Sequence, residues 1–202
     1  YADISWWVTP LPHTCTAINQ NVRTVEGRYR DLRLGVWIRL VDGTDVKVED
    51  YDAGTMTPFG IAVHDGNCGF VVSLGAQVNK LWALSGSFPA TNFVGGIEAP
   101  QPADDTQGQA NCHNILVDDR FDRDTVPAIE YCSDYVWPDG GKHGYLPAIG
   151  ELVIADNNLD AINDALAKCG GTAYTLKSGV WWSSSQGSAA NAWCLLNGAP
   201  IS

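Results

Sequence analysis

Three short apolar runs, each next to turn residues, most limit what this chain folds into. They cover residues 34–41, 58–64 and 69–74. Asp42-Gly43-Thr44 follows the first run and leads into a further short strand, and Asp65-Gly66-Asn67 joins the second run to the third. Strands linked by such short turns pair with their neighbours in an antiparallel sheet. We therefore expect an antiparallel sheet between residues 34 and 74.

Two helical segments are expected after this sheet. The first covers residues 125–135 and has Pro127 in its first turn, where a missing N–H costs nothing. The second covers residues 148–169, breaks near Asp156-Asn157 and ends at Gly170-Gly171. With the strands before them, these segments predict an α+β fold with long loops. Its two helices pack on a small mixed or antiparallel sheet.

The other segments are less regular. Residues 84–124 are rich in Gly, Pro, Asp and Gln and predict a long loop, which is often functional at that length. Residues 144–147 predict a short apolar strand that leads into the second helix. Residues 179–198 predict two short strands around a loop of small residues, whose hydrogen-bonding groups and backbone are adaptable.

The N-terminal segment differs in composition from the rest of the chain. Residues 6–12 are apolar and contain two prolines, which excludes a helix and predicts an extended strand or packing arm. Residues 21–33 hold four arginines and predict a short helix or linker. We divide the chain into an arm or linker at residues 1–33 and a ligand-binding domain at residues 34–202.

The charge of the chain limits its partners. The sequence has 12 basic and 23 acidic residues, for a formal net charge of -11. Such a surface repels phosphate backbones and anionic membranes, so neither is an expected partner. No apolar stretch has the length that membrane insertion requires. Eight tryptophans and 21 glycines are typical of loop-rich proteins that bind ligands with rigid aromatic surfaces.

The six cysteines do not define their own chemistry. They are Cys15, Cys68, Cys112, Cys132, Cys169 and Cys194. No pair has the CxxC spacing of zinc ribbons or thioredoxin-like redox sites. An even number allows three disulfides in an oxidising compartment, but a core of this size does not need them. Three disulfides and six mostly buried free thiols therefore remain equal alternatives.

Several motifs, in order, resemble a known family. Pro58-Phe59-Gly60-Ile61-Ala62 begins the series, and Leu146-Pro147-Ala148-Ile149-Gly150-Glu151-Leu152 and Trp182-Ser183-Ser184-Ser185 follow, before Asn191-Ala192-Trp193 ends it. Residues 34–202 thus resemble the C-type-lectin-like domains common in proteins of gut Bacteroidetes and their phages. That group includes fimbrial-tip-like proteins and the variable proteins diversified by retroelements.

The resemblance implies a binding face near the C-terminus. In diversified members, the last strands and loops carry the variable residues, whose side chains point outward from a rigid scaffold. Trp182, Ser183, Ser184 and Trp193 match the scaffold part of the motif. Family members usually continue with a further apolar strand after Asn-Gly, so the short remainder of this sequence implies either a very short final strand or a sequence that ends early. The residues expected to contact ligand are Trp181, Ser185, Gln186, Ser188, Asn191, Cys194, Leu196 and Asn197.

No motif for catalysis, metal binding or cofactor binding accompanies these features. The fold also resembles formylglycine-generating enzymes, but those have two active-site cysteines close together in sequence, whereas 24 residues separate Cys169 from Cys194. The Glu-Pro-Asn and Trp-Asn-Asp motifs of calcium-dependent lectins are missing. We interpret the acidic run at residues 118–124 as a solvated loop. We expect no enzyme, no metal and no cofactor.

The resulting hypothesis is non-enzymatic recognition of a macromolecular ligand, either a cell-surface protein or a glycan. The expected setting is extracellular, on a cell or virion surface. There the chain acts as a retroelement-diversified receptor-binding protein of phage-tail or bacterial-adhesin type. The alternative is a fimbrial tip or structural pilus subunit, in which the N-terminal arm mediates assembly by strand addition. In either case the arm makes a homo-oligomer possible. A formylglycine-generating-enzyme-like oxidase is the remaining alternative.

Overall fold

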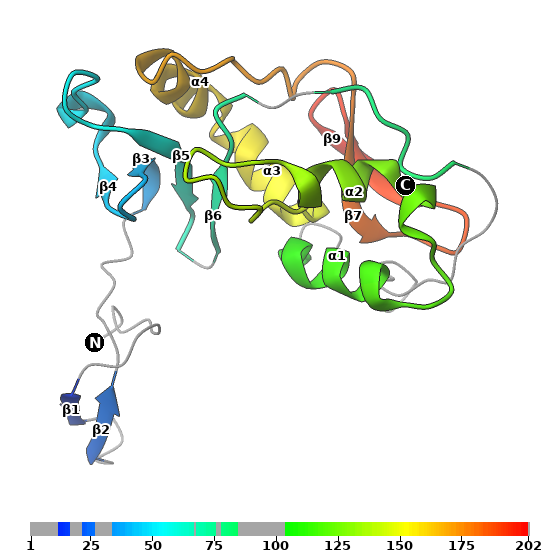
Figure 1. The fold of residues 1–202 in the computed structure, drawn as a ribbon, viewed down its shortest axis with the longest axis horizontal. Helices are drawn as coiled ribbons and strands as arrows, with labels where there is room; N and C mark the ends of the chain where they lie inside the picture. The colour runs from blue at the N-terminus through cyan, green and yellow to red at the C-terminus, as the bar shows by residue number, and fades with distance from the viewer. Residues whose placement is uncertain are drawn as a thin grey trace.

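The computed structural model describes residues 12–16, 22–26, 34–66, 68–75, 78–84 and 104–201. In the N-terminal part, β1 (Pro12–Thr16) and β2 (Val22–Glu26) pair antiparallel as a two-stranded sheet (Figure 1). The expectation of a helix or linker at residues 21–33 is therefore wrong for the part that is described. Three of the five residues of β2 are β-branched, which favours extended backbone. Of the extended segment expected at residues 6–12, only Pro12 is described, and it begins β1, whereas residues 6–11 lie outside the described residues.

A four-stranded antiparallel sheet follows, in the order β4-β3-β5-β6. Its strands are β3 (Gly35–Leu40), β4 (Asp45–Val46), β5 (Pro58–His64) and β6 (Gly69–Val72). The strands predicted in residues 34–74 are confirmed, as is their antiparallel pairing. The 3₁₀ helix η1 (Val48–Asp50) lies between β4 and β5. The sheet is anchored at β5, whose last residues before His64 are fully buried.

Four α-helices lie between this sheet and the C-terminal strands, within the described residues. They are α1 (Gly108–Val117), α2 (Pro127–Asp134), α3 (Ile149–Asn157) and α4 (Leu159–Lys168). The prediction of α2 is confirmed, and so is that of the second helix, which breaks at Asn158 into α3 and α4. Gly170 follows α4 with φ +69°, and the N–H of Gly171 donates to Leu166 O at 2.8 Å. This is the glycine ending expected from the sequence.

Two expectations for the middle of the chain are wrong. The long loop expected at residues 84–124 is wrong for its described C-terminal part, which contains α1, and the 3₁₀ helix η3 (Arg123–Thr125) lies across its end. Residues 85–103 of that expectation lie outside the described residues. Because α1 has no clear apolar period, its helical state depends on tertiary contacts that a sequence pattern does not contain. Residues 144–147 form no strand. They are held instead by individual hydrogen bonds, such as the one that Leu146 N–H donates to Cys112 Sγ at 3.2 Å.

The C-terminal strands form a second antiparallel sheet in the order β7-β8-β9. They are β7 (Val180–Gln186), β8 (Ala192–Leu196) and β9 (Ala199–Ile201). The two strands expected in this region are confirmed, and β9 is the very short final strand. Asn197 and Gly198, with φ of 49° and 83°, form the tight turn between β8 and β9. Asn-Gly is the preferred dipeptide where both turn residues need positive φ.

Helix α3 lies between the two sheets (Figure 1). It packs against β7, β8 and β9, whereas α4 packs against β3 and β5. The main core therefore combines side chains from both sheets and both helices, including Ile38, Ile61, Ile149, Ile162 and Leu195. A second, smaller core joins α1 and α2 to Trp82 and Leu146, and Trp182 packs against it. The observed class is α+β with antiparallel sheets.

Candidate ligand-binding cavity

A cavity lies against one face of the C-terminal sheet. Opposed residues of antiparallel strands share a face, and Trp182 is opposite Cys194, which is opposite Ile201. Val180 and Leu196 are paired one step further along the same face. All five side chains line a space of about 860 Å³. This lies within the usual range for small-molecule sites, roughly 300–1,000 Å³.

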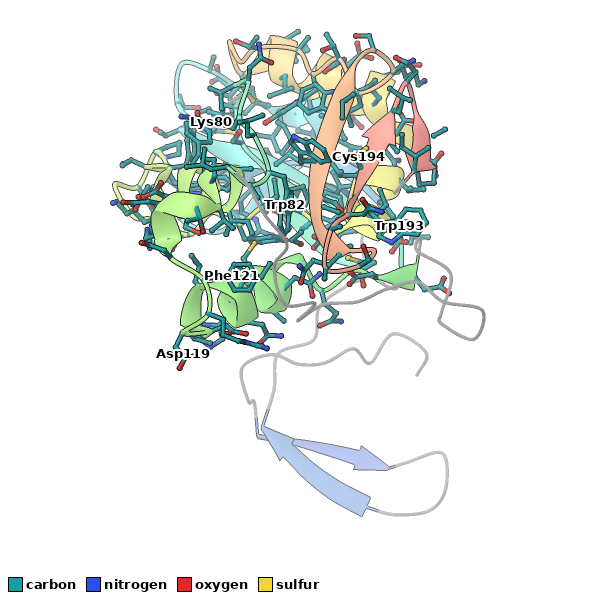
Figure 2. The ribbon with its side chains drawn as sticks, turned by 90° about the vertical axis from the view of Figure 1, so that its right-hand side faces the viewer. Lys80, Trp82, Asp119, Phe121, Trp193 and Cys194 are labelled. Carbon is teal, nitrogen blue, oxygen red and sulfur yellow. The ribbon has the colours of Figure 1, made fainter. Side chains whose placement is uncertain are left out.

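The other walls of the cavity come from segments far apart in the sequence. They include β6, the strip formed by residues 78–84, helix α2, and the inner surfaces of α3 and α4. The strip is held beside β7 because Trp82 Nε1–H donates to Ser183 O at 2.8 Å. Two residues further along the strip, Leu84 N–H donates to Thr125 O at 3.0 Å. Figure 2 shows Lys80 and Trp82 in succession on this strip, beside the sheet that carries Cys194.

Four large apolar side chains at the cavity are exposed to solvent. Val78 and Leu81 are 50% and 59% exposed, and Val180 and Ile201 are 52% and 41% exposed. These four residues are called the apolar rim below. Scattered exposed apolar residues are ordinary, but a group around one opening marks a site where something apolar binds. The apolar rim therefore identifies the mouth of the cavity.

Aromatic rings form much of the inner wall. Tyr174 meets Trp181 edge to face with 6.2 Å between ring centroids, and Tyr135 meets Trp137 in the same way at 5.6 Å. Such rings offer rigid apolar surface at little cost in conformational entropy. The Tyr174 hydroxyl already has a hydrogen-bond partner within the protein, since it lies 2.6 Å from the Ser73 hydroxyl. The wall thus has broad apolar contact area and few polar groups.

The serines of the Trp-Ser-Ser-Ser motif tie β7 to the rest of the fold. Ser184 N–H donates to Pro147 O at 2.8 Å. The Ser185 hydroxyl accepts from Ile149 N–H at 3.0 Å and donates to Asp105 Oδ2 at 2.5 Å. Ser185 therefore satisfies a free N–H in the first turn of α3. These bonds, with that of Ser183 Oγ to Trp193 O at 2.7 Å, are called the serine frame below.

Glu151 completes the start of α3 from within the helix. Its carboxylate accepts from Ala148 N–H at 2.8 Å and from the Tyr145 hydroxyl at 2.9 Å. This is half of a capping box, because the alanine side chain has no group to return a bond. Burial raises the pKa of Glu151 to about 7, and the charge of Asp105 adds to the rise, despite the hydrogen bonds that lower it.

The structure corrects the expectation that Ser185, Gln186 and Cys194 point outward. Their exposed fractions are 0%, 1% and 5%. Ser185 belongs to the serine frame, and Gln186 ends β7 where the strand enters the interior. Cys194 is covered by its neighbours at the inner wall of the cavity. The motif's pattern of small polar residues is typical of loops, so sequence alone did not reveal this burial.

The side chains of two more expected contact residues form hydrogen bonds with the backbone of turns. The Ser188 hydroxyl accepts from Ala190 N–H at 3.0 Å and from Asn191 N–H at 3.1 Å. The Asn197 side chain accepts from Gly179 N–H at 3.0 Å. Asn191 is exposed on the β7–β8 turn. These polar groups mainly hold the backbone, which leaves little of the adaptable hydrogen-bonding surface that the sequence predicted.

The remaining expected residues meet at the cavity. Trp181, Leu196 and, at the inner wall, Cys194 all line it. Sequence reasoning missed the opposite wall, including Lys80, Tyr131 and Tyr174. These positions have no common spacing or motif, so only the tertiary fold brings them together. Of the four residues matched to the scaffold, Ser183 and Ser184 are buried as expected and Trp193 packs against the main core, whereas Trp182 also lines the cavity.

The described cysteines are free thiols that stay protonated near neutral pH. The five cysteines whose side chains are described are Cys68, Cys112, Cys132, Cys169 and Cys194. Burial raises the pKa of Cys132 to about 12 and that of Cys169 to about 11, and it also raises the pKa of Cys194. Because the thiolate is the nucleophile, these environments disfavour thiol chemistry.

Three comparisons with known proteins add no relative. No protein-family model matches the chain, and no curated protein or solved structure does. Within the described ranges, no three His, Cys, Asp or Glu side chains are grouped so that they would hold a metal ion. None of the helices in these ranges is long and apolar enough to cross a bilayer.

Proposed function

We propose that the chain is a non-enzymatic recognition protein with a C-type-lectin-like fold, which binds its ligand at the cavity beside the C-terminal sheet. The biological setting we favour is a retroelement-diversified receptor-binding protein on a virion or bacterial surface. The observation that carries the binding proposal is the meeting of Val180, Trp181, Trp182, Leu196 and Ile201 at one solvent-open apolar cavity. Open apolar cavities with rigid walls are the usual form of a ligand site.

The contacts between the motifs support the fold proposal. The Leu-Pro-Ala-Ile-Gly-Glu-Leu run and the Trp-Ser-Ser-Ser run, which carry the resemblance, touch each other through Pro147 and Ile149. Ser185 has a physical reason to be a serine, because its small hydroxyl reaches a helix N-terminus that a larger side chain would displace. Motifs that interlock in this way define a scaffold, as expected for a domain that varies its ligand contacts elsewhere.

The state of the thiols supports a binding role over the oxidase alternative. An oxidase of the formylglycine-generating type needs reactive cysteines, whereas the raised pKa values of Cys169 and Cys194 keep both thiols protonated. Assembly through the N-terminal arm, whether in a homo-oligomer or in a fimbria, stays a prediction. No contact of the described residues bears on it.

The lining of the cavity favours an apolar ligand group. A sugar binds through hydroxyls that need several hydrogen-bonding partners, but this wall is mostly aliphatic and aromatic. Of the two macromolecular partners expected, a protein or a glycan, the cavity favours a partner that brings an apolar group. The formal net charge of -11 continues to disfavour nucleic acid.

Binding of the neutral fluorescent dye Nile red tests this function. We expect one dye molecule per chain, and we expect Leu196→Trp to weaken its binding at least tenfold because the larger ring fills the cavity beside Val180. Asn191→Trp is the matched control, since it adds the same ring on an exposed turn outside the lining. Circular dichroism checks that both variants fold. Equal dye binding by both variants, or no binding by the parent chain, would contradict the proposal.

A further inference from the structure

The size of the cavity narrows the class of ligand that enters it. A space of about 860 Å³ is much larger than any one amino-acid side chain needs. Its lining includes apolar residues of the main core, such as Phe70, Leu152 and Ile162, so the space reaches far beneath the apolar rim. A whole small molecule with an extended apolar body fits these dimensions better than a single anchoring side chain.

The charged groups of the described lining are placed asymmetrically. Lys80 and Glu151 are its only members of the Asp, Glu, Lys and Arg types. Lys80 is exposed, and its ammonium lies 5.7 Å from the centroid of the Tyr131 ring. No carboxylate in the described part of the chain pairs with it. Glu151 lies at the inner wall, where Ala148 N–H and the Tyr145 hydroxyl bind it.

This asymmetry sets an orientation for a ligand with one charged end. An anionic group is attracted to the ammonium of Lys80, where water still solvates both charges. The same group placed deep in the cavity loses its hydration and meets the carboxyl group of Glu151. An apolar body is favoured at the inner wall for the opposite reason. The charged end therefore belongs at the mouth.

Resting on the proposed use of this cavity as a binding site, we propose that its occupant is a monomeric amphiphile with one carboxylate rather than an apolar group of a macromolecular partner. Its apolar body fills the cavity while the carboxylate lies beside Lys80. An anionic bilayer presents the same chemistry as a surface, but the formal net charge of -11 opposes its approach. A single carboxylate at the mouth interacts mainly with the nearby ammonium of Lys80, because salt screens charges that lie more than about 10 Å away.

Displacement of Nile red by dodecanoate, below its micelle-forming concentration, tests this inference. We expect dodecanoate to bind about tenfold more tightly than decanoate, since two fewer methylene groups are buried in the shorter chain. Lys80→Gln should weaken dodecanoate binding about threefold and leave dodecan-1-ol binding unchanged. Lys168→Gln is the control because it removes an exposed lysine at the end of α4, away from the lining. It should alter neither ligand's binding.

The possible failures are distinct. If dodecan-1-ol binds as tightly as dodecanoate, or if Lys80→Gln weakens both equally, the carboxylate assignment is wrong although the cavity still binds apolar ligands. If the chain binds phosphatidylglycerol vesicles and monomeric dodecanoate does not displace Nile red, the proposal that the ligand is a monomeric amphiphile is wrong. Nile red binding that no amphiphile displaces contradicts this inference alone. Absence of Nile red binding contradicts the proposed function itself.

Discussion

At the residue scale, Ser185 joins three parts of the chain through one hydroxyl. It accepts from the first helical N–H of α3 in a buried bond, and it donates to the half-buried Asp105. We expect Ser185→Ala to lower the free energy of unfolding by about 2 kcal/mol, because the buried N–H of Ile149 loses its acceptor and Asp105 loses a donor. Urea denaturation measures this. Ser188→Ala, which removes a hydroxyl from an exposed turn, should cost about 0.5 kcal/mol, and an equal cost for both would contradict the serine frame.

Glu151 gives the fold a pH dependence of predictable sign. Its pKa is about 7 in the folded chain against an ordinary value of 4.5. Between these values the folded state binds the proton more tightly, so the free energy of unfolding falls as pH rises from about 5 to 8 and levels off above that. The expected fall is about 2–3 kcal/mol.

The variant Glu151→Gln isolates this contribution, because the amide is neutral throughout this pH range. Its free energy of unfolding should change much less between pH 5 and pH 8 than that of the parent chain, as measured by urea denaturation at each pH. The amide keeps an oxygen that can accept from Ala148 N–H or Tyr145, so the variant should still fold. If the free energy of unfolding of the parent chain instead rises between pH 5 and pH 8, the prediction is contradicted, because Glu151 then ionises in the folded chain at little cost.

At the element scale, α1 depends on its close approach to α3. A Cβ added to Gly108 would lie 2.3 Å from Glu151 Oε2 and 2.7 Å from Ala148 N. Both belong to a buried, hydrogen-bonded group that cannot move freely. We expect Gly108→Ala to lower the free energy of unfolding by about 1–3 kcal/mol, although alanine is intrinsically the better helix former. Gln109→Ala, at the exposed neighbouring position, should change stability by less than about 0.5 kcal/mol. Stabilisation by Gly108→Ala would contradict this packing.

The elements that were predictable from the sequence are those with local signals. Turn residues define β3, β5 and β6, Pro127 begins α2, and Gly170 with Gly171 ends α4. Helix α1 has no such signal, because its stability comes from packing against β7 and from hydrogen bonds to Ser184 and Leu146, which are distant in sequence. The site was partly predictable for the same reason. Trp181 and Leu196 follow from the motif, whereas Lys80 and Tyr131 meet them only in the tertiary fold.

At the scale of the whole molecule, the two sheets and their helices leave a cavity that no single element contains. The serine frame and the bonds of Glu151 fix β7 and α3 on one side, and the strip at residues 78–84 bounds the other. A site of this kind combines a rigid frame with side chains that can be exchanged at its surface. The fixed part is the network beneath the sheet together with the core residues of the lining, and under the proposed function the exchangeable part is the apolar rim.

The tryptophans provide the most direct measurement of the central claim that ligand binds in this cavity. Trp137, Trp181 and Trp182 line it, whereas Trp37 and Trp193 do not. Titration of ¹⁵N-labelled protein with Nile red, followed by the indole N–H resonances in two-dimensional NMR, compares the two groups directly. The account predicts saturable shifts of the Trp137, Trp181 and Trp182 signals, with much smaller changes at Trp37 and Trp193. Shifts confined to Trp37 and Trp193, or no shifts at all, would contradict it.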